Sequence, residues 1–136
     1  MWKSVGNLEY SLSDNYYRLV LSVDPELHRY FRALIPKYYV CNIQKYPPHI
    51  TVVRGETPVN LDVWGRYKGI KAEFEYDSYL HCDGIYWWFN CFSKALTDIR
   101  LELGLPASYH LTRPPDGTEC FHSTVGNRKV PRPSEK

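Results

Sequence analysis

Two short motifs in this sequence combine side chains that can transfer protons with side chains that can bind phosphate. His49-Ile50-Thr51 and His122-Ser123-Thr124 each carry a histidine, one intervening residue and a threonine, followed directly by a valine. Histidine serves as acid or base near neutral pH because its ordinary pKa is about 6.5. A threonine hydroxyl can donate a hydrogen bond to a phosphate oxygen. Two such pairs facing one pocket would suit phosphodiester cleavage without a metal ion.

Both motifs lie in runs that are typical of β-strands. Residues i and i+2 of a strand point to the same face, so each motif presents its imidazole and its hydroxyl side by side. Pro47-Pro48 imposes extended backbone immediately before the first motif. A single histidine in such a place is more often structural and bonded to a backbone carbonyl. The second copy is what favours catalysis by His49 and His122, with Thr51 and Thr124 as phosphate ligands.

The length and net charge of the chain limit the classes of protein to which it can belong. The chain has 136 residues and a net charge of +2, which indicates one domain and a small anionic ligand rather than a long nucleic acid. No run approaches the ~20 apolar residues of a membrane span, and the first residues lack the apolar core of a signal peptide. We therefore expect a cytoplasmic protein without a membrane partner; the sequence makes no prediction of its oligomeric state.

Four cysteines show none of the paired spacings typical of metal sites, and three of them lie in apolar, strand-like runs. Buried free thiols are the expected state. We predict no metal site and no cofactor.

The remaining pattern predicts strands and helices that would position the motifs. Asp24-Pro25-Glu26 is a typical helix start, and Ser93 and Gly104 bracket a second helix. His28 lies off the apolar stripe of the first helix and is expected to face solvent. Residues 1–15 are polar and could form an arm or a lid. The predicted elements are strands at 16–23, 70–76 and 85–92, helices at 25–35 and 94–103, and loops with a short strand at 57–69.

The order strand, helix, His-x-Thr strand occurs twice. It predicts a first lobe at about 16–56, a second lobe at about 85–127, and a flexible tail at 128–136. Two such halves related by a pseudo-twofold axis would bring both motifs to a central cleft. The expected fold class is α/β (α+β), with mostly antiparallel sheets around the cleft and the helices outside.

These motifs and their order resemble the 2H phosphoesterase superfamily, which has one His-x-Thr/Ser motif in each lobe of a duplicated fold. Val52 and Val125 match the apolar residue that many members carry after the threonine. The resemblance covers nearly the whole chain as an order of elements, but only the two tripeptides as sequence. It implies metal-independent cleavage of cyclic phosphates or of 2′–5′ and 3′–5′ phosphodiesters, with one histidine as base and the other as acid.

Within that superfamily the chain is most similar to the compact viral and phage branch, which includes the anti-CBASS nucleases that destroy cyclic oligonucleotide signals. That similarity implies a small nucleotide substrate, a role against host immune signalling, and host cytoplasm as the location. Two alternatives stay open. One is a 2′,3′-cyclic phosphodiesterase acting on RNA termini, and the other is a module that sequesters a nucleotide without cleaving it.

Aromatic and basic residues near the motifs are candidates for substrate binding. The chain is 15% aromatic, and aromatic rings can stack on nucleobases. Alternation in the strand at 85–92 allows only one of its two tryptophans to face the cleft. Arginine suits phosphate because its planar fork can make two hydrogen bonds. The candidates for base stacking are Tyr10, Trp87, Trp88 and Tyr109, and those for phosphate binding are Arg54 and Arg113.

Overall fold

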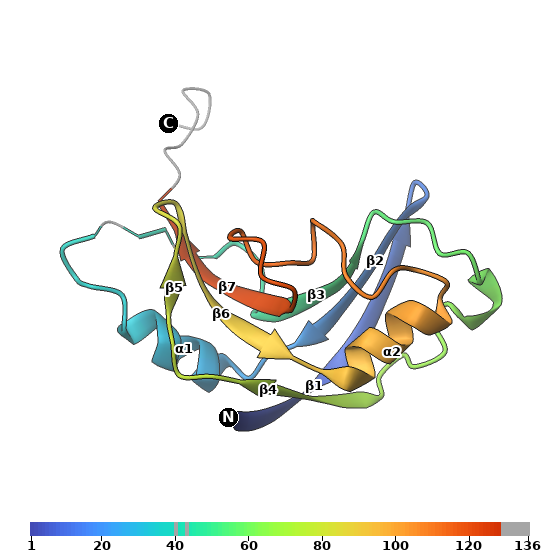
Figure 1. Ribbon diagram of the computed structural model, residues 1–136, viewed down its shortest axis with the longest axis horizontal. Coiled ribbons are helices and arrows are strands. Elements are labelled where there is room, and N and C mark those ends of the chain that lie inside the picture. Colours follow the sequence, from blue (N-terminus) through green and yellow to red (C-terminus); the bar gives the residue numbers. More distant parts are fainter. Residues whose placement is uncertain (40, 43, 129–136) are drawn as a thin grey trace.

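In the part of the chain that the structure describes, the fold is mixed α+β: seven antiparallel strands form one sheet and two α-helices lie against it (Figure 1). The computed structural model describes residues 1–39, 41–42 and 44–128, so the predicted tail lies outside the described residues except for Arg128. The elements in chain order are β1 (Trp2–Ser13), β2 (Tyr16–Ser22), α1 (Pro25–Ala33), β3 (His49–Arg54), the 3-10 helix η1 (Leu61–Val63), β4 (Lys71–Tyr76), β5 (His81–Cys82), β6 (Tyr86–Phe92), α2 (Lys94–Glu102) and β7 (Phe121–Asn127).

The capping pattern read from the sequence is present at both helices. The Asp24 carboxylate accepts a hydrogen bond from the backbone N–H of Glu26, and the Ser93 hydroxyl accepts one from that of Leu96. Two segments differ from expectation. Residues 57–69 hold η1 in place of a strand, and the polar N-terminal segment is the long strand β1. A two-residue turn with positive φ at Asp14 and Asn15 returns β1 into β2, a conformation that these short polar residues tolerate.

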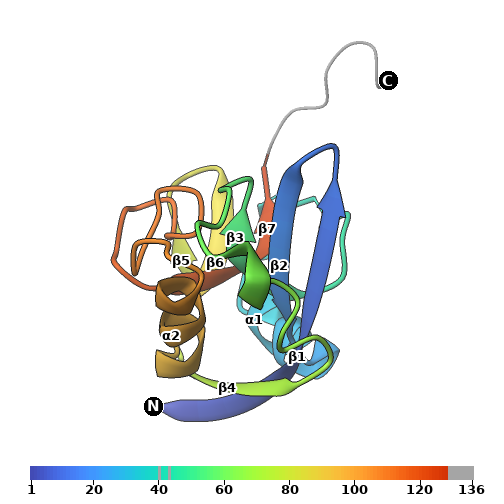
Figure 2. The same cartoon turned by 90° about the vertical axis from the view of Figure 1, so that its right-hand side faces the viewer.

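The strand order brings the two motif-bearing strands to opposite ends of the sheet. β3 pairs with β2, β2 with β1, and β1 with β4, all antiparallel. β4 and β5 share one edge of β6, since Cys91 pairs with Tyr76 and Trp88 with His81, while β7 occupies the other edge. The two end strands nevertheless lie against each other, as Figure 2 shows. The sheet therefore curves until its ends meet.

A glycine in β1 permits this curvature. The first half of β1 pairs with β4 and the second half with β2, so the strand passes from one partner to the next near Gly6 and Asn7. A Cβ atom on Gly6 would lie 1.8 Å from the carbonyl oxygen of Ser22. The Ser22 hydroxyl also accepts a hydrogen bond from the Asn7 N–H at 2.9 Å. Only a residue without a side chain allows this close approach.

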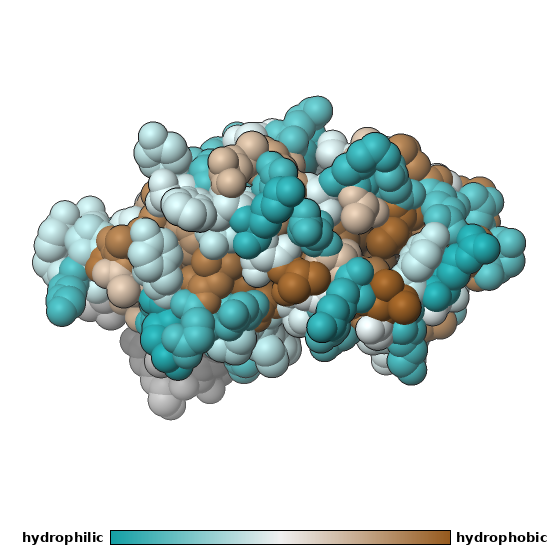
Figure 3. Space-filling view, turned by 90° about the horizontal axis from the view of Figure 1, so that it is seen from below, coloured by the Kyte–Doolittle hydropathy of each residue, from teal (hydrophilic) through white to brown (hydrophobic). Residues whose placement is uncertain are grey.

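The hydrophobic core lies between the sheet and the helices. Phe31 of α1 stacks on Phe89 of β6 with ring centroids 4.2 Å apart, and Leu96 of α2 is fully buried. On the face seen from below, hydrophobic residues lie in separate patches between hydrophilic side chains (Figure 3). Neither α1 nor α2, nor any other helix within the described ranges, has the length and apolar run that crossing a membrane requires.

Candidate active site

The four motif side chains line one cavity of about 320 Å³ between β3 and β7. His49 and Thr51 come from β3, and His122 and Thr124 come from β7. The cavity also contains residues from the segment before β3, from the loop before β7, and from the start of β6. These other lining residues are Gln44, Lys45, Tyr46, Arg54, Tyr86, Leu111 and Asn127.

Strand β3 places three cavity residues on one face through alternation and a β-bulge. Ile50 and Val52 are fully buried in the core, so His49 and Thr51 point to the other face. The pairing with β2 shifts register between Thr51 and Val53, which leaves Val52 as the extra residue. A bulge of this kind re-aims the side chains that follow it. It is why Arg54, three residues after Thr51, also lines the cavity.

Strand β7 repeats this arrangement. Thr124 pairs with Trp88 and Gly126 with Trp87, which leaves Val125 as the extra residue of a second bulge. Asn127, three residues after Thr124, then lines the cavity. The sequence prediction included Arg54 but missed Asn127, although both occupy the same place relative to their threonine.

Both motif histidines bond a backbone carbonyl through Nδ1. His49 Nδ1 lies 2.8 Å from the carbonyl oxygen of Pro47, and His122 Nδ1 lies 3.2 Å from that of Thr112. A carbonyl can only accept, so Nδ1 carries the hydrogen and Nε2 of the neutral ring has the free electron pair. In each ring, Nε2 is thus the nitrogen that can take up or release a proton.

The second motif also bonds the first directly. The Ser123 hydroxyl donates a hydrogen bond to the backbone carbonyl of His49 at 2.9 Å, and the Ser123 side chain is fully buried. Ser123 is the middle residue of its motif, and its side chain points opposite to those of His122 and Thr124. This contact fixes the two histidine-bearing strands relative to each other.

Burial lowers the pKa of both histidines. The His122 pKa falls to about 4, chiefly because the ring is desolvated, with the hydrogen bond to Thr112 opposing the shift. The His49 pKa is also lowered, first by burial and then by the positive charges of Arg18 and Arg54. Both imidazoles are therefore neutral at pH 7, and burial favours this form most strongly at His122.

The low pKa of His122 predicts loss of stability in acid. Its folded-state pKa of about 4 lies below the unfolded value of about 6.5, so the unfolded chain binds the additional proton as pH falls between these values. Stability is fully present above the unfolded pKa and decreases toward pH 4. We expect His122 alone to account for about 2.5 kcal/mol of this loss at pH 4.5. Urea unfolding of wild type and of a His122→Gln variant at pH 7.5 and 4.5 measures it, and an equal loss in both proteins would contradict the assignment.

Positive charge gathers at the cavity although the whole chain is nearly neutral. Lys45 and Arg54 line the cavity, and Arg18 lies opposite Arg54 on the neighbouring strand. The Arg18 guanidinium also lies 6.0 Å from the centre of the Tyr46 ring. A local set of cations is suited to a ligand with few negative charges, such as a single phosphodiester.

The cavity lining also combines side-chain amides with two tyrosines. The Asn127 amide donates to Gln44 Oε1 at 3.2 Å and accepts from the Asn42 amide at 3.1 Å. Tyr46 is 66% exposed, and Tyr86 lines the same cavity. Planar amides and rings are the groups that bind the edges and faces of nucleobases.

The sequence prediction missed most of these groups. Gln44, Lys45 and Tyr46 lie in an irregular segment whose only sequence signal is its position just before Pro47-Pro48. Finding Tyr86 requires the β6–β7 register, in which it pairs with Asn127.

Of the six residues predicted to bind substrate, the structure brings only Arg54 to the cavity. The tryptophans are nearly buried, at 7% exposure for Trp87 and 1% for Trp88. Trp88 lies on the same sheet face as Thr124 but stacks against His81, and its indole N–H bonds Asn90. Trp87 packs against Tyr39 in the core.

The other three predicted binding residues also lie away from the cavity, Tyr10 in β1 and the other two in the loop before β7. Tyr10 packs edge-on against Trp64, in a small cavity beside α2. Tyr109 contacts His110, and Arg113 Nη1 lies 3.9 Å from a carboxylate oxygen of Glu119. Sequence proximity to the motifs does not reveal these packing arrangements.

His28 is not at the surface, where the helical pattern placed it. It is half-buried, and its Nε2 lies 3.2 Å from the carbonyl oxygen of Thr124. Burial lowers its pKa. The side chain therefore contributes to holding β7 rather than to the solvent-facing surface of α1.

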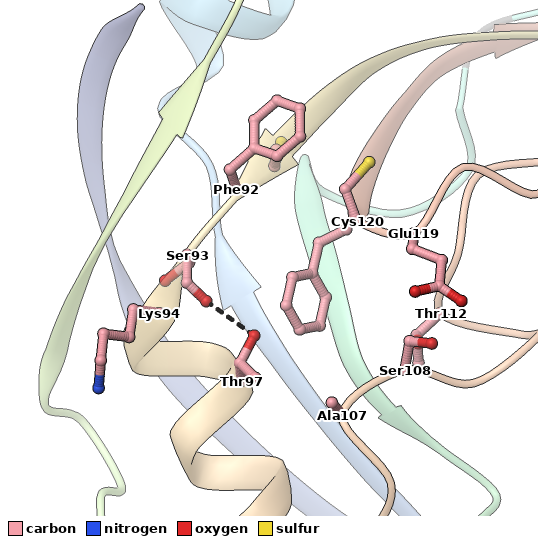
Figure 4. A pocket seen from close by; sticks show the side chains of 11 residues that line it. Phe92, Ser93, Lys94, Thr97, Ala107, Ser108, Thr112, Glu119 and Cys120 are labelled. Atoms are coloured by element: carbon pink, nitrogen blue, oxygen red, sulfur yellow. Dashed lines mark hydrogen bonds between the residues drawn. The ribbon is translucent and has the colours of Figure 1, made fainter.

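A second cavity of about 300 Å³ lies between the start of α2 and the loop before β7 (Figure 4). It contains two thiols, but burial raises the pKa of Cys120 to about 11 and that of Cys91 well above its ordinary value. Protonated thiols are poor nucleophiles. Lys94 at its rim is paired with Asp98 at 2.6 Å. Glu119 also lines this cavity, but no histidine does, so the cavity does not offer the pair of imidazoles found in the first one.

All four cysteines are free thiols, as expected, but only Cys91 is buried; Cys82 is exposed, and Cys41 and Cys120 are half-buried. Within residues 1–39, 41–42 and 44–128, no group of three or more His, Cys, Asp or Glu side chains is placed to hold a metal ion. No family model matches the chain, and neither a curated protein nor a solved structure matches it.

Proposed function

We propose that this protein is a phosphodiesterase of the 2H type that acts on small nucleotides without a metal ion. The observation that carries the proposal is the joint placement of two His-Thr pairs in one cavity. Each histidine has Nδ1 held by a backbone carbonyl, which leaves Nε2 for proton transfer. Cleaving a phosphodiester requires one group to remove a proton and another to supply one, and this cavity contains a candidate for each.

The unequal environments of the two imidazoles support one assignment of their roles. His122 is the general base, because its lower pKa keeps it neutral, and it takes a proton from water or from the ribose hydroxyl beside the phosphate. His49 is the general acid; a bound phosphate anion raises its pKa, so that it can protonate the leaving oxygen. The hydroxyls of Thr51 and Thr124 donate hydrogen bonds to the non-bridging phosphate oxygens and stabilise the charge that develops there.

We also propose that the fold is a two-lobed duplication with the cavity between its lobes. The two motif strands support this proposal because they are alike in detail. Thr51 pairs with Val20 and Thr124 with Trp88, and each threonine is followed at once by a bulged valine. The third residue after each threonine, Arg54 or Asn127, lines the cavity.

Cavity size favours a substrate bound one nucleotide at a time. A volume of about 320 Å³ is near the lower end of the ~300–1,000 Å³ typical of ligand sites. A cyclic oligonucleotide would then place one phosphodiester and one base in the cavity and its other units outside. The exposed ring of Tyr46 at the rim provides a surface on which a base can stack.

The test is a cleavage panel in EDTA, containing cyclic dinucleotides, cyclic trinucleotides, 2′,3′-cyclic mononucleotides and 2′–5′ oligoadenylate. We expect turnover of at least one member, with the products identified by mass spectrometry. Preference for a cyclic oligonucleotide would support a role against host immune signalling, and preference for 2′,3′-cyclic phosphates would support action on RNA termini. Tight binding of a member that is recovered intact would overturn the proposal in favour of a sequestering module.

A further inference from the structure

Two arginines, one on each helix, reach from one half of the chain to the motif strand of the other half. Arg32 lies on α1, which precedes β3 in the sequence, yet it contacts β7. Arg100 lies on α2, which precedes β7, yet it contacts β3. The helices follow the same crossed arrangement, because α1 packs against β7 and α2 packs against β3. Each helix thus covers the motif strand that lies farther away in the sequence.

Both arginines bind the same point of their target strand. Arg32 Nη1 donates to the carbonyl oxygen of Val125 at 2.9 Å, and Arg100 Nη1 donates to that of Val52 at 2.9 Å. These valines are the bulged residues that directly follow Thr124 and Thr51. Each bulge also turns a later residue toward the cavity, Asn127 on β7 and Arg54 on β3. Each arginine therefore hydrogen-bonds its target strand at the bulge that sets this direction.

Arg100 is fixed by hydrogen bonds from all three of its guanidinium nitrogens. Its side chain is 0% exposed and its two terminal nitrogens bond the Glu56 carboxylate at 2.7 and 2.8 Å. Its Nε donates to the carbonyl oxygen of Pro106 at 2.8 Å. The guanidinium thereby joins β3 to the segments that follow β3 and α2.

Arg32 is half-buried, and its guanidinium donates to backbone carbonyls. Besides Val125, it reaches the carbonyl oxygens of Cys41 at 3.4 Å and Asn42 at 3.5 Å. Those residues begin the segment that leads to Gln44, Lys45 and Tyr46 at the cavity. Arg32 therefore ties this segment and the β7 bulge to α1, where His28 adds a second contact to β7.

We propose that Arg32 and Arg100 are positioning residues, each of which holds the His-x-Thr strand of the other half in the geometry that the cavity requires. The expected effect on catalysis rests on the proposed function, but the expected effect on the position of the two strands does not. A planar guanidinium can bind several oxygens at once, whereas a lysine ammonium acts as a compact point charge. The crossed contacts predict crossed effects: Arg32 controls His122, and Arg100 controls His49.

The experiment is an NMR titration of the histidine imidazoles in the full chain. In Arg32→Met, which keeps an aliphatic stem but has no donor, we expect the His122 pKa to rise by about one unit toward its ordinary value while that of His49 stays unchanged. Arg32→Lys should restore part of the difference. In Arg100→Lys, which retains a buried positive charge, the His49 pKa should move and that of His122 should not.

Arg29→Met is the matched control, because Arg29 lies on the same helix and pairs with Glu26 at 2.7 Å on the surface; it should shift neither histidine. If the wild-type protein cleaves its substrate, Arg32→Met should lower kcat about tenfold with KM changed less than about twofold. Unchanged histidines in both variants, or equal shifts of both histidines in each variant, would overturn the positioning role. A wild-type protein that cleaves nothing would instead overturn the proposed function and leave the titration result standing.

Discussion

Replacing either motif histidine by alanine is expected to lower kcat/KM by about a hundredfold to ten-thousandfold. His49→Ala removes the proposed acid, and His122→Ala removes the proposed base. Because both groups act in one displacement, each loss should by itself nearly abolish turnover. Steady-state rates on the preferred nucleotide, measured with each variant at the pH optimum of the wild type, give the size of the effect.

His110→Ala is the control for these variants, because His110 is an exposed residue of the loop before β7 and is not among those that line the cavity. It should retain wild-type turnover. The double variant His49→Ala/His122→Ala should be hardly slower than the slower single variant, since residues that act as a unit are not additive. Two effects that multiply would instead indicate histidines acting in separate steps.

Arg100→Met is expected to lower the free energy of unfolding by about 3–5 kcal/mol. Glu56 is only 7% exposed and loses both hydrogen bonds from the guanidinium, so its carboxylate would be buried without a partner. The carbonyl of Val52 loses its donor as well. Urea unfolding at pH 7 measures the change, with a shift of the midpoint at constant m-value as the expected form.

Two further variants show whether the cost comes from the buried charge. Arg100→Met/Glu56→Leu removes both ions and should recover part of the lost stability, because apolar residues of similar size can replace a buried pair. Lys94→Met breaks the exposed pair with Asp98 on the same helix, where the side chains are 87% and 53% exposed. It should cost less than about 1 kcal/mol. Equal losses from Lys94→Met and Arg100→Met would contradict this account.

Local sequence signals predicted the elements that carry the motifs. Asp24-Pro25 and Ser93 predicted the starts of both helices, because helix capping depends only on residues that are close in the sequence. Alternation in β3 and β7 predicted that His49 and Thr51, like His122 and Thr124, share a face, and the four line one cavity. The mixed α+β class followed from the order of these elements.

The features that sequence could not supply depend on contacts between distant segments. Nothing local distinguishes Trp88, which is buried under His81, from an aromatic residue that faces a ligand. From the sequence alone, Arg100 is an ordinary polar residue of α2. In the structure it is fully buried because Glu56 lies across from it. The sequence of β1 is polar and shows no alternating apolar pattern. The segment forms a strand because it pairs with β2 and with β4.

The central claim is that two imidazoles in one cavity cleave a phosphodiester without a metal ion. The most direct measurement is the turnover of the preferred panel member in EDTA by wild type, His49→Ala and His122→Ala in parallel. We predict that wild-type turnover survives the chelator and is lost in both variants. Activity retained in either variant, or lost from the wild type in EDTA and restored by adding a divalent cation, would contradict the claim.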